Sequence, residues 1–118
     1  EIKNIASSTP LNRVVVKDNN GIHIIATNDI YCIEAQDDYI FIYSKQGRYI
    51  KKQTMKSVEK RLNPSQFIRV HRSYIANVVQ IDKLEAYEKD SYIAILKNDK
   101  KVKVSAAGYK LLRAQLDF

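Results

Sequence analysis

Apolar and polar residues alternate with a period of two through most of the chain, which predicts β-strands. The alternation is clearest where Ile68 and Val70 would share one face of a strand and Arg69 and His71 the other. About eight such stretches predict strands over residues 12–17, 22–27, 30–35, 39–43, 48–53, 67–71, 79–87 and 92–96, with a short alternating segment at 101–104. Clusters of Asn, Asp and Gly separate several of them and favour tight turns.

Two stretches change to helical spacing. Thr54 is a suitable N-cap for a helix that ends at Leu62, with Met55, Val58 and Leu62 on one face. Ser105 would cap a last helix, in which Tyr109, Leu112 and Leu116 recur at helical spacing. These elements predict a mainly β domain with two short helices, of the α+β class, and a mixed or antiparallel sheet.

The segment after Arg72 breaks the alternation. Ser73 can cap a short helical turn, and Tyr74 and Val78, four residues apart, would share its buried side. Residues 67–77 therefore predict a strand that runs into a corner, with Arg69, His71 and Arg72 at its rim.

Length and composition favour one domain. Residues 1–10 are polar, end in proline and predict a linker or tail, so that residues 11–118 form the domain. Cys32 stands alone, which excludes an internal disulfide. We find no signal peptide and no apolar run long enough to span a membrane, and we expect a cytoplasmic protein.

The net charge of +7 lies in one stretch of the sequence. Residues 48–72 hold eight basic residues and one acid, whereas the rest of the chain holds 12 basic and 12 acidic residues. A focused excess of this kind indicates a polyanionic partner. The candidates for contacts with phosphates are Lys51, Lys52, Lys56, Lys60, Arg61 and Arg69, for which a solvated face is the alternative. Arg72 could donate two hydrogen bonds to a guanine edge or, equally well from the residues alone, form a surface ion pair.

Other chemistry finds little support. Asp37 and Asp38 lack the third ligand that a metal site would need, and a turn explains them better. The two histidines, His23 and His71, have no partnering motif, and His71 is as well explained by a structural role as by a phosphate contact. We therefore predict no enzymatic activity, no cofactor and no metal.

The eleven residues F-I-R-V-H-R-S-Y-I-A-N, from Phe67 to Asn77, resemble the signature of the LytTR family of DNA-binding domains. Further similarity lies at residues 30–35, 38–40, 54–62, 81 and 104–105, so that the resemblance covers roughly residues 13–116. It implies a domain whose loops and strand ends enter the major groove of double-stranded DNA.

The resemblance also implies site residues. The position of Arg72 faces DNA in the family, Asp38 or Tyr39 matches a second contact position, and the start of the last helix makes a third. Many members carry an arginine just after the serine that matches Ser105, but this chain has Ala106-Ala107-Gly108, with Lys110 as a possible substitute. The candidate DNA-binding residues are Arg69, His71, Arg72, Ser73, Asp38, Tyr39, Lys51, Lys52, Lys56, Ser105, Ala107 and Lys110.

By the same resemblance, the function is transcription regulation by the effector domain of a bacterial two-component response regulator. The partners would be repeated promoter sites, a receiver domain in the full-length protein and, indirectly, a sensor histidine kinase, with a dimer formed only on DNA. Two alternatives stay open. The charge and the eight tyrosines also suit an RNA or single-strand binder, and a basic face could dock an acidic protein.

Overall fold

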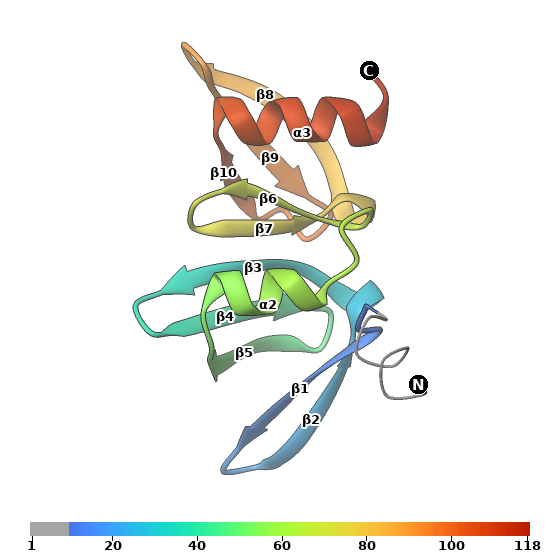
Figure 1. The fold of residues 1–118 in the computed structure, drawn as a ribbon, viewed down its shortest axis with the longest axis vertical. Coiled ribbons are helices and arrows are strands. Elements are labelled where there is room, and N and C mark those ends of the chain that lie inside the picture. The colour runs from blue at the N-terminus through green and yellow to red at the C-terminus, as the bar shows by residue number, and fades with distance from the viewer. Residues whose placement is uncertain (1–9) are drawn as a thin grey trace.

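A computed structural model of the protein describes residues 10–118 (Figure 1). These residues form ten strands and two α-helices: β1 Arg13–Asp18, β2 Gly21–Ala26, β3 Ile30–Gln36, β4 Tyr39–Ser44, β5 Gly47–Lys52, α2 Met55–Arg61, β6 Phe67–His71, β7 Tyr74–Asn77, β8 Ile81–Glu88, β9 Ser91–Leu96, β10 Lys101–Val104 and α3 Ala106–Leu116. Two short 3-10 turns, η1 Thr27–Asp29 and η2 Val78–Gln80, precede β3 and β8. The predicted mainly β class with two helices is confirmed. Of the predicted tail, only Pro10 belongs to the described residues.

The strands form three sheets, and every strand pair in the described part is antiparallel. A five-stranded sheet has the order β5-β4-β3-β7-β6, a three-stranded sheet the order β10-β9-β8, and β1 pairs only with β2. Figure 1 shows these parts as a stack, with α3 and β8–β10 at one end, the five-stranded sheet and α2 in the middle, and the β1–β2 hairpin at the other end.

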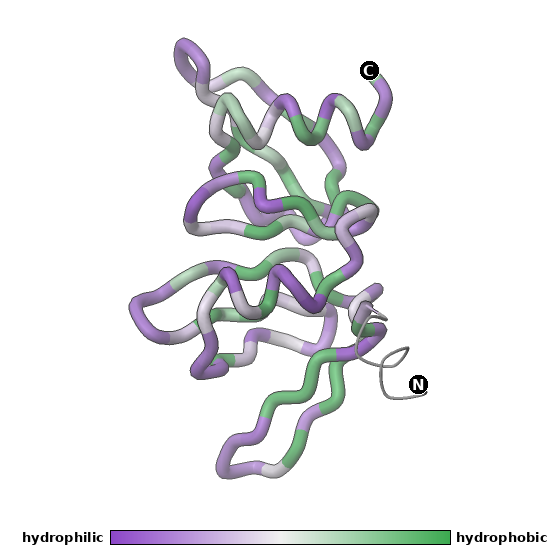
Figure 2. Tube along the Cα trace, in the orientation of Figure 1, coloured by the Kyte–Doolittle hydropathy of each residue, from purple (hydrophilic) through white to green (hydrophobic). Residues whose placement is uncertain are grey.

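The five-stranded sheet separates two apolar cores, because successive strand residues point to opposite faces. One face carries Ile33, Ile40 and Ile42, which pack with the apolar residues of α2 and of the β1–β2 hairpin and form the first core. The other face carries Cys32 and Ala76, which belong to the second core. Its other buried residues are Ile68, Val70, Ala94, Leu96, Val102, Val104 and Leu112. Along the tube in Figure 2, apolar segments follow the strands and hydrophilic segments mark the turns.

Helix α2 forms as its sequence predicts. The Thr54 hydroxyl accepts a hydrogen bond from the Ser57 N–H, and Met55, Val58 and Leu62 are buried. Lys56, Lys60 and Arg61 lie on the exposed side. The helix therefore covers the first core and turns its cations outward.

We expect Thr54→Ala to lower the free energy of unfolding by about 1 kcal/mol, because the first turn of α2 loses its side-chain cap. Thr54→Ser keeps the hydroxyl and serves as the control. Urea denaturation of the three proteins measures the difference. Equal stability of the alanine and serine variants would show that this hydroxyl does not stabilise the helix.

The helical turn predicted after Ser73 is wrong. Tyr74–Asn77 is strand β7, which pairs with β3 on one side and with β6 on the other. Tyr74 and Val78 still pack against the second core, Tyr74 from β7 and Val78 from the 3-10 turn that follows it. The 3-10 turn comes afterwards, at Val78–Gln80, and the predicted strand over residues 79–87 starts at Ile81.

Asn77 holds the corner after β7. Its side chain is completely buried; Nδ2 donates to the Ile30 carbonyl at 2.9 Å, and Oδ1 accepts from the Val79 N–H at 3.1 Å. The last residue of the Phe67–Asn77 motif therefore has a structural role: it satisfies backbone groups that the end of the strand leaves without ladder partners.

Candidate nucleic-acid interface

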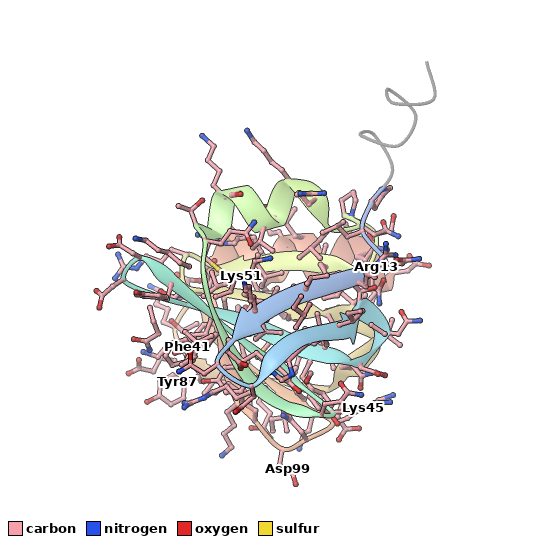
Figure 3. All side chains as sticks on the ribbon, turned by 90° about the horizontal axis from the view of Figure 1, so that it is seen from below. Arg13, Phe41, Lys45, Lys51, Tyr87 and Asp99 are labelled. Carbon is pink, nitrogen blue, oxygen red and sulfur yellow. The ribbon has the colours of Figure 1, made fainter. Side chains whose placement is uncertain are left out.

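Three segments predicted to contact DNA lie on one side of the molecule. They are the β3–β4 turn at Asp37–Asp38, the β6–β7 turn at Arg72–Ser73 and the start of α3 at Ser105–Ala107. Figure 1 shows all three at the left, one above another, beside the start of α2. We call this side the contact edge. In Figure 3, Lys45 marks the β4–β5 turn and Tyr87 marks the end of β8, and the two lie on opposite sides of the view. The β4–β5 turn is therefore not part of the contact edge.

Backbone hydrogen bonds hold the three segments together. The Ala35 N–H, near the end of β3, donates to the Ser73 carbonyl at 2.9 Å, and the Ser105 N–H donates to the Val70 carbonyl, also at 2.9 Å. The pairing of β6 with β7 shifts register between Arg69 and His71, so Val70 stands at a β-bulge. The contact edge thus joins turns that are distant in the sequence through backbone hydrogen bonds.

Arg72 is exposed at the tip of the β6–β7 turn. It lines an open hollow of about 780 Å³ together with residues of the β3–β4 turn, the end of β5 and the start of α2. The sequence candidates that line this hollow are Asp38, Tyr39, Lys52, Lys56, Arg69 and Arg72. Six predicted residues from four segments therefore converge, and four of them are cations.

His71 lines a second hollow, of about 460 Å³, on the α3 side of the same turn. Its Nδ1 accepts the Ser73 N–H at 3.1 Å, so the proton of the neutral ring lies on Nε2. Burial, together with the charges of Arg72, Lys103 and Arg69, lowers the pKa of His71 below its ordinary value. His71 is therefore neutral near pH 7, supports the turn through Nδ1 and keeps Nε2–H as a donor.

Arg69 is bonded to neighbouring groups of the protein. Its Nη1 lies 3.1 Å from the Glu59 carboxylate on α2, its Nε donates to the His71 carbonyl at 3.2 Å, and its Nη2 donates to the Arg72 carbonyl. The sequence suggested a phosphate contact for this residue, whereas the structure binds three of its five N–H donors to the protein itself.

The start of α3 is packed directly on β6. The Ser105 hydroxyl accepts from the Gly108 N–H at 3.0 Å and donates to the Val70 carbonyl at 3.3 Å, so the predicted cap is present. Ala107 and Lys110 are exposed on the first turns of the helix. Both hydrogen bonds of the Ser105 hydroxyl are therefore made within the protein. The groups that could face a ligand here are the backbone of the first helical turn and the Lys110 side chain.

The basic stretch does not form one surface. Lys52 and Lys56 line the hollow beside Arg72, whereas Lys51 lines another hollow, between β1 and α2, with Arg13 and Arg61. Lys51 is the strand neighbour of Lys52 and so faces the other side of the sheet, the side of its pairing partner Ile40. In Figure 3 it lies beside the β1–β2 hairpin. The structure therefore does not bring Lys51 to the contact edge.

Lys103 is a candidate that sequence reasoning missed. It is exposed on β10, lines the second hollow and lies close enough to His71 to lower the pKa of that ring. The signal was present in Lys101-Val102-Lys103-Val104, where alternation turns both lysines outward on the strand that leads into Ser105.

Most tyrosines are engaged within the fold. The hydroxyls of Tyr43 and Tyr74 donate to the Glu34 carboxylate at 2.8 and 3.1 Å, and the rings of Tyr92 and Tyr109 stack with centroids 3.7 Å apart. Burial and Glu34 raise the pKa of Tyr43 and of Tyr74 to about 12. Tyr39 and Tyr87 are the tyrosines with large exposed areas. They lie on different hairpins and form no stacking platform for bases.

The Asp37–Asp38 pair forms a turn, as predicted, with Asp37 in the left-handed region at φ 53°. Among residues 10–118, no three His, Cys, Asp or Glu side chains gather as a metal ion would require. Within the same range, no helix is both long enough and apolar enough to cross a membrane.

Comparison with known proteins shows the family and the fold. The model of the LytTr DNA-binding domain family matches residues 20–117. A solved structure from Bacillus cereus described as a LytTr DNA-binding domain superposes with a TM-score of 0.83 at 24% identity, over 92% of this chain and 99% of the other.

Curated relatives are regulatory proteins. The sensory transduction protein LytT of Enterococcus faecalis is 28% identical over 97% of this chain and 48% of its own length. The transcriptional regulatory protein LytR of Staphylococcus aureus is 31% identical over 86% of this chain and 41% of its own. The transcriptional regulatory protein YpdB of Escherichia coli is 32% identical over 91% of this chain and 47% of its own length. The chain therefore spans about half the length of these relatives.

Proposed function

Because the chain belongs to the LytTr DNA-binding domain family, we propose that it binds double-stranded DNA through the contact edge and reads sequence there for transcription regulation. The observation that supports this role is the convergence of the β3–β4 turn, the β6–β7 turn and the start of α3, held together by backbone hydrogen bonds. Loops that are fixed relative to one another can enter successive parts of a groove without ordering costs.

The residues would divide the work between positioning and reading. Lys52, Lys56, Lys103 and Lys110 are placed to contact phosphates, which hold a protein on DNA without selecting a sequence. Arg72 has the planar fork that matches a guanine edge. The exposed first turn of α3, at Ala107, suits a phosphate because a helix N-terminus carries positive partial charge.

Asp38 and Tyr39 would face the groove from the β3–β4 turn. A carboxylate there can accept from a cytosine amino group but repels phosphate, so this turn would select bases rather than add affinity.

The relatives suggest the wider setting. We propose that the full-length protein joins this domain to a receiver domain, that a sensor histidine kinase acts on that receiver, and that two copies meet only on repeated promoter sites. This proposal places the protein in the cytoplasm and gives it no enzymatic role. The names of the relatives support only sensory transduction and transcription regulation, in proteins about twice as long as this chain. The receiver domain, the kinase and the pairing on DNA follow from the family resemblance.

Competition binding tests the choice of nucleic acid. Duplexes selected from a random pool should be retained when single-stranded DNA or RNA of the same sequence is added in excess. Displacement by either single strand would favour the alternative of a single-strand binder. Association with acidic proteins but with no nucleic acid would favour the protein-interaction alternative.

Salt dependence tests which lysines contact phosphates. The double variant Lys52→Gln/Lys56→Gln should flatten the slope of log affinity against log salt by up to about two, since each neutralised phosphate contributes about 0.9. Lys51→Gln/Arg61→Gln removes the same charge from the hollow beside β1 and is the matched control. Equal flattening by both pairs would show that the contact edge does not set the phosphate contacts.

A further inference from the structure

The guanidinium of Arg69 links α2 to the β6–β7 turn. It contacts Glu59 on α2 at 3.1 Å, the His71 carbonyl at 3.2 Å and the Arg72 carbonyl. We propose that Arg69 is a positioning residue for DNA readout: it sets the conformation of the turn that presents Arg72, and Glu59 orients it. This inference rests on the proposed function and assigns Arg69 a role other than a DNA contact.

Three of the five N–H donors of Arg69 are already bound to groups of the protein. A guanidinium has five N–H donors in a fixed plane, and here three of its nitrogens point to the Glu59 carboxylate and to two successive carbonyls. The Arg69 side chain is 29% exposed, whereas Arg72 is exposed at the tip of the turn. A phosphate at Arg69 would have to compete with an opposite charge that is already in place.

The contacts of Arg69 complete the fixation of the turn. On its other sides, the turn is held by the Ser73 N–H, which donates to His71 Nδ1, and by the Ser73 carbonyl, which accepts from Ala35. Within residues 10–118, the side chain that donates to the Arg72 carbonyl is that of Arg69. The direction in which the Arg72 side chain leaves the backbone therefore depends on Arg69.

Lysine cannot replace this arrangement. An ammonium group keeps the charge, but it is one compact centre and cannot bind two carbonyls and a carboxylate in the spread geometry of a guanidinium. Arg69→Lys is thus the informative variant, because it would preserve a simple phosphate contact and lose the positioning. Glu59→Gln releases the opposite end of the link without altering a group proposed to touch DNA.

The experiment compares these variants with matched controls on a selected duplex and a scrambled duplex. Arg13→Lys changes an exposed arginine away from the contact edge, and Glu85→Gln breaks an exposed ion pair with Lys83 on β8. We expect Arg69→Lys to lose about tenfold of the preference for the selected site, with an unchanged salt slope, and Glu59→Gln to lose several-fold. The controls should keep the full preference.

Two results would overturn the proposal. One is full discrimination by Arg69→Lys. The other is tighter binding of both duplexes by Glu59→Gln, which is expected if Arg69 is a phosphate contact whose charge Glu59 offsets. Circular dichroism confirms that the variants are folded, and Glu59→Gln, on an exposed helix position, offers a second route should Arg69→Lys unfold.

An NMR measurement on the free protein keeps the two proposals separable. If the chain showed no preference for any duplex, the proposed function would fail, but the positioning role could still be decided. Arg69→Lys should then change the chemical shifts of the Arg72 and Ser73 backbone amides and speed their hydrogen exchange. The amides of Asp99 and its turn should be unchanged in both respects. Unaltered amides at Arg72 and Ser73 would refute the positioning role.

Discussion

Gly108→Ala is expected to lower the free energy of unfolding by about 3 kcal/mol, the upper end of the usual cost of forcing an extra group into a packed interior. A Cβ at position 108 would lie 2.1 Å from the Val70 carbonyl oxygen and 2.8 Å from the Val70 Cα. These are backbone atoms, so no side-chain rotation relieves the contact. The helix has to move away from β6 or the strand has to shift.

The sign of this effect separates packing from helix propensity. Alanine stabilises an isolated helix by up to about 1 kcal/mol relative to glycine, so a change governed by propensity would raise stability. Ala114→Ser, at an exposed position of the same helix, is the control for a one-atom addition. Urea denaturation gives the free energies, and a Gly108→Ala variant as stable as the parent would show that α3 docks differently.

The same substitution should weaken DNA binding. The Ser105 N–H and hydroxyl both donate to the Val70 carbonyl, which is the group that the new methyl would approach. Displacement of α3 therefore separates Ser105 and Ala107 from the β6–β7 turn. Affinity measured on a selected duplex should fall with the loss of α3 docking, while Ala114→Ser should bind as the parent does.

Arg72→Lys is expected to lose about 1–3 kcal/mol of preference for the selected site, with almost unchanged binding to unrelated DNA. Arg72 leaves a turn whose backbone is held by Arg69, His71 and Ala35, so its planar fork is presented from a fixed origin. Lysine keeps the charge and loses the fork. Competition between a selected and a scrambled duplex at one salt concentration measures the difference.

Arg61→Lys is the control for Arg72→Lys, because Arg61 is an exposed arginine of α2 that lines the hollow away from the contact edge. It should leave discrimination unaltered. If Arg72→Lys also discriminates as the parent does, Arg72 contacts phosphate only, and sequence reading would have to come from the β3–β4 turn or from α3.

The two predictions address different parts of one arrangement. Val70 occupies the bulge of β6, receives Ser105 from α3 and directly precedes the turn that bears His71 and Arg72. Gly108 allows the helix to approach it, and Arg69 binds the turn from the other side. The contact edge therefore depends on packing around β6 as much as on its exposed cations.

Local patterns in the sequence were sufficient for the elements that carry their own signals. Thr54 with Met55 and Val58 predicts α2, Ser105 predicts the start of α3, and the alternation around Val70 predicts which side of β6 is buried. The resemblance around Phe67–Asn77 led to the family that the comparisons show. These features depend on caps and periodicity, which neighbouring residues determine.

The tertiary structure decided what depends on distant partners. Tyr74–Asn77 became a strand because β3 and β6 supply ladder partners on both sides, and a four-residue spacing could not distinguish strand from helix. Lys51 and Lys52 separated because adjacent residues of β5 face opposite layers, although their charges are consecutive in the sequence. The role of Arg69 comes from its contact with Glu59, which lies 10 residues away in the sequence and on another element. The role of Gly108 comes from its close approach to Val70, which also belongs to another element. Charge and periodicity can be read along a chain, but the atoms that a side chain meets are determined only when the sheets and helices pack.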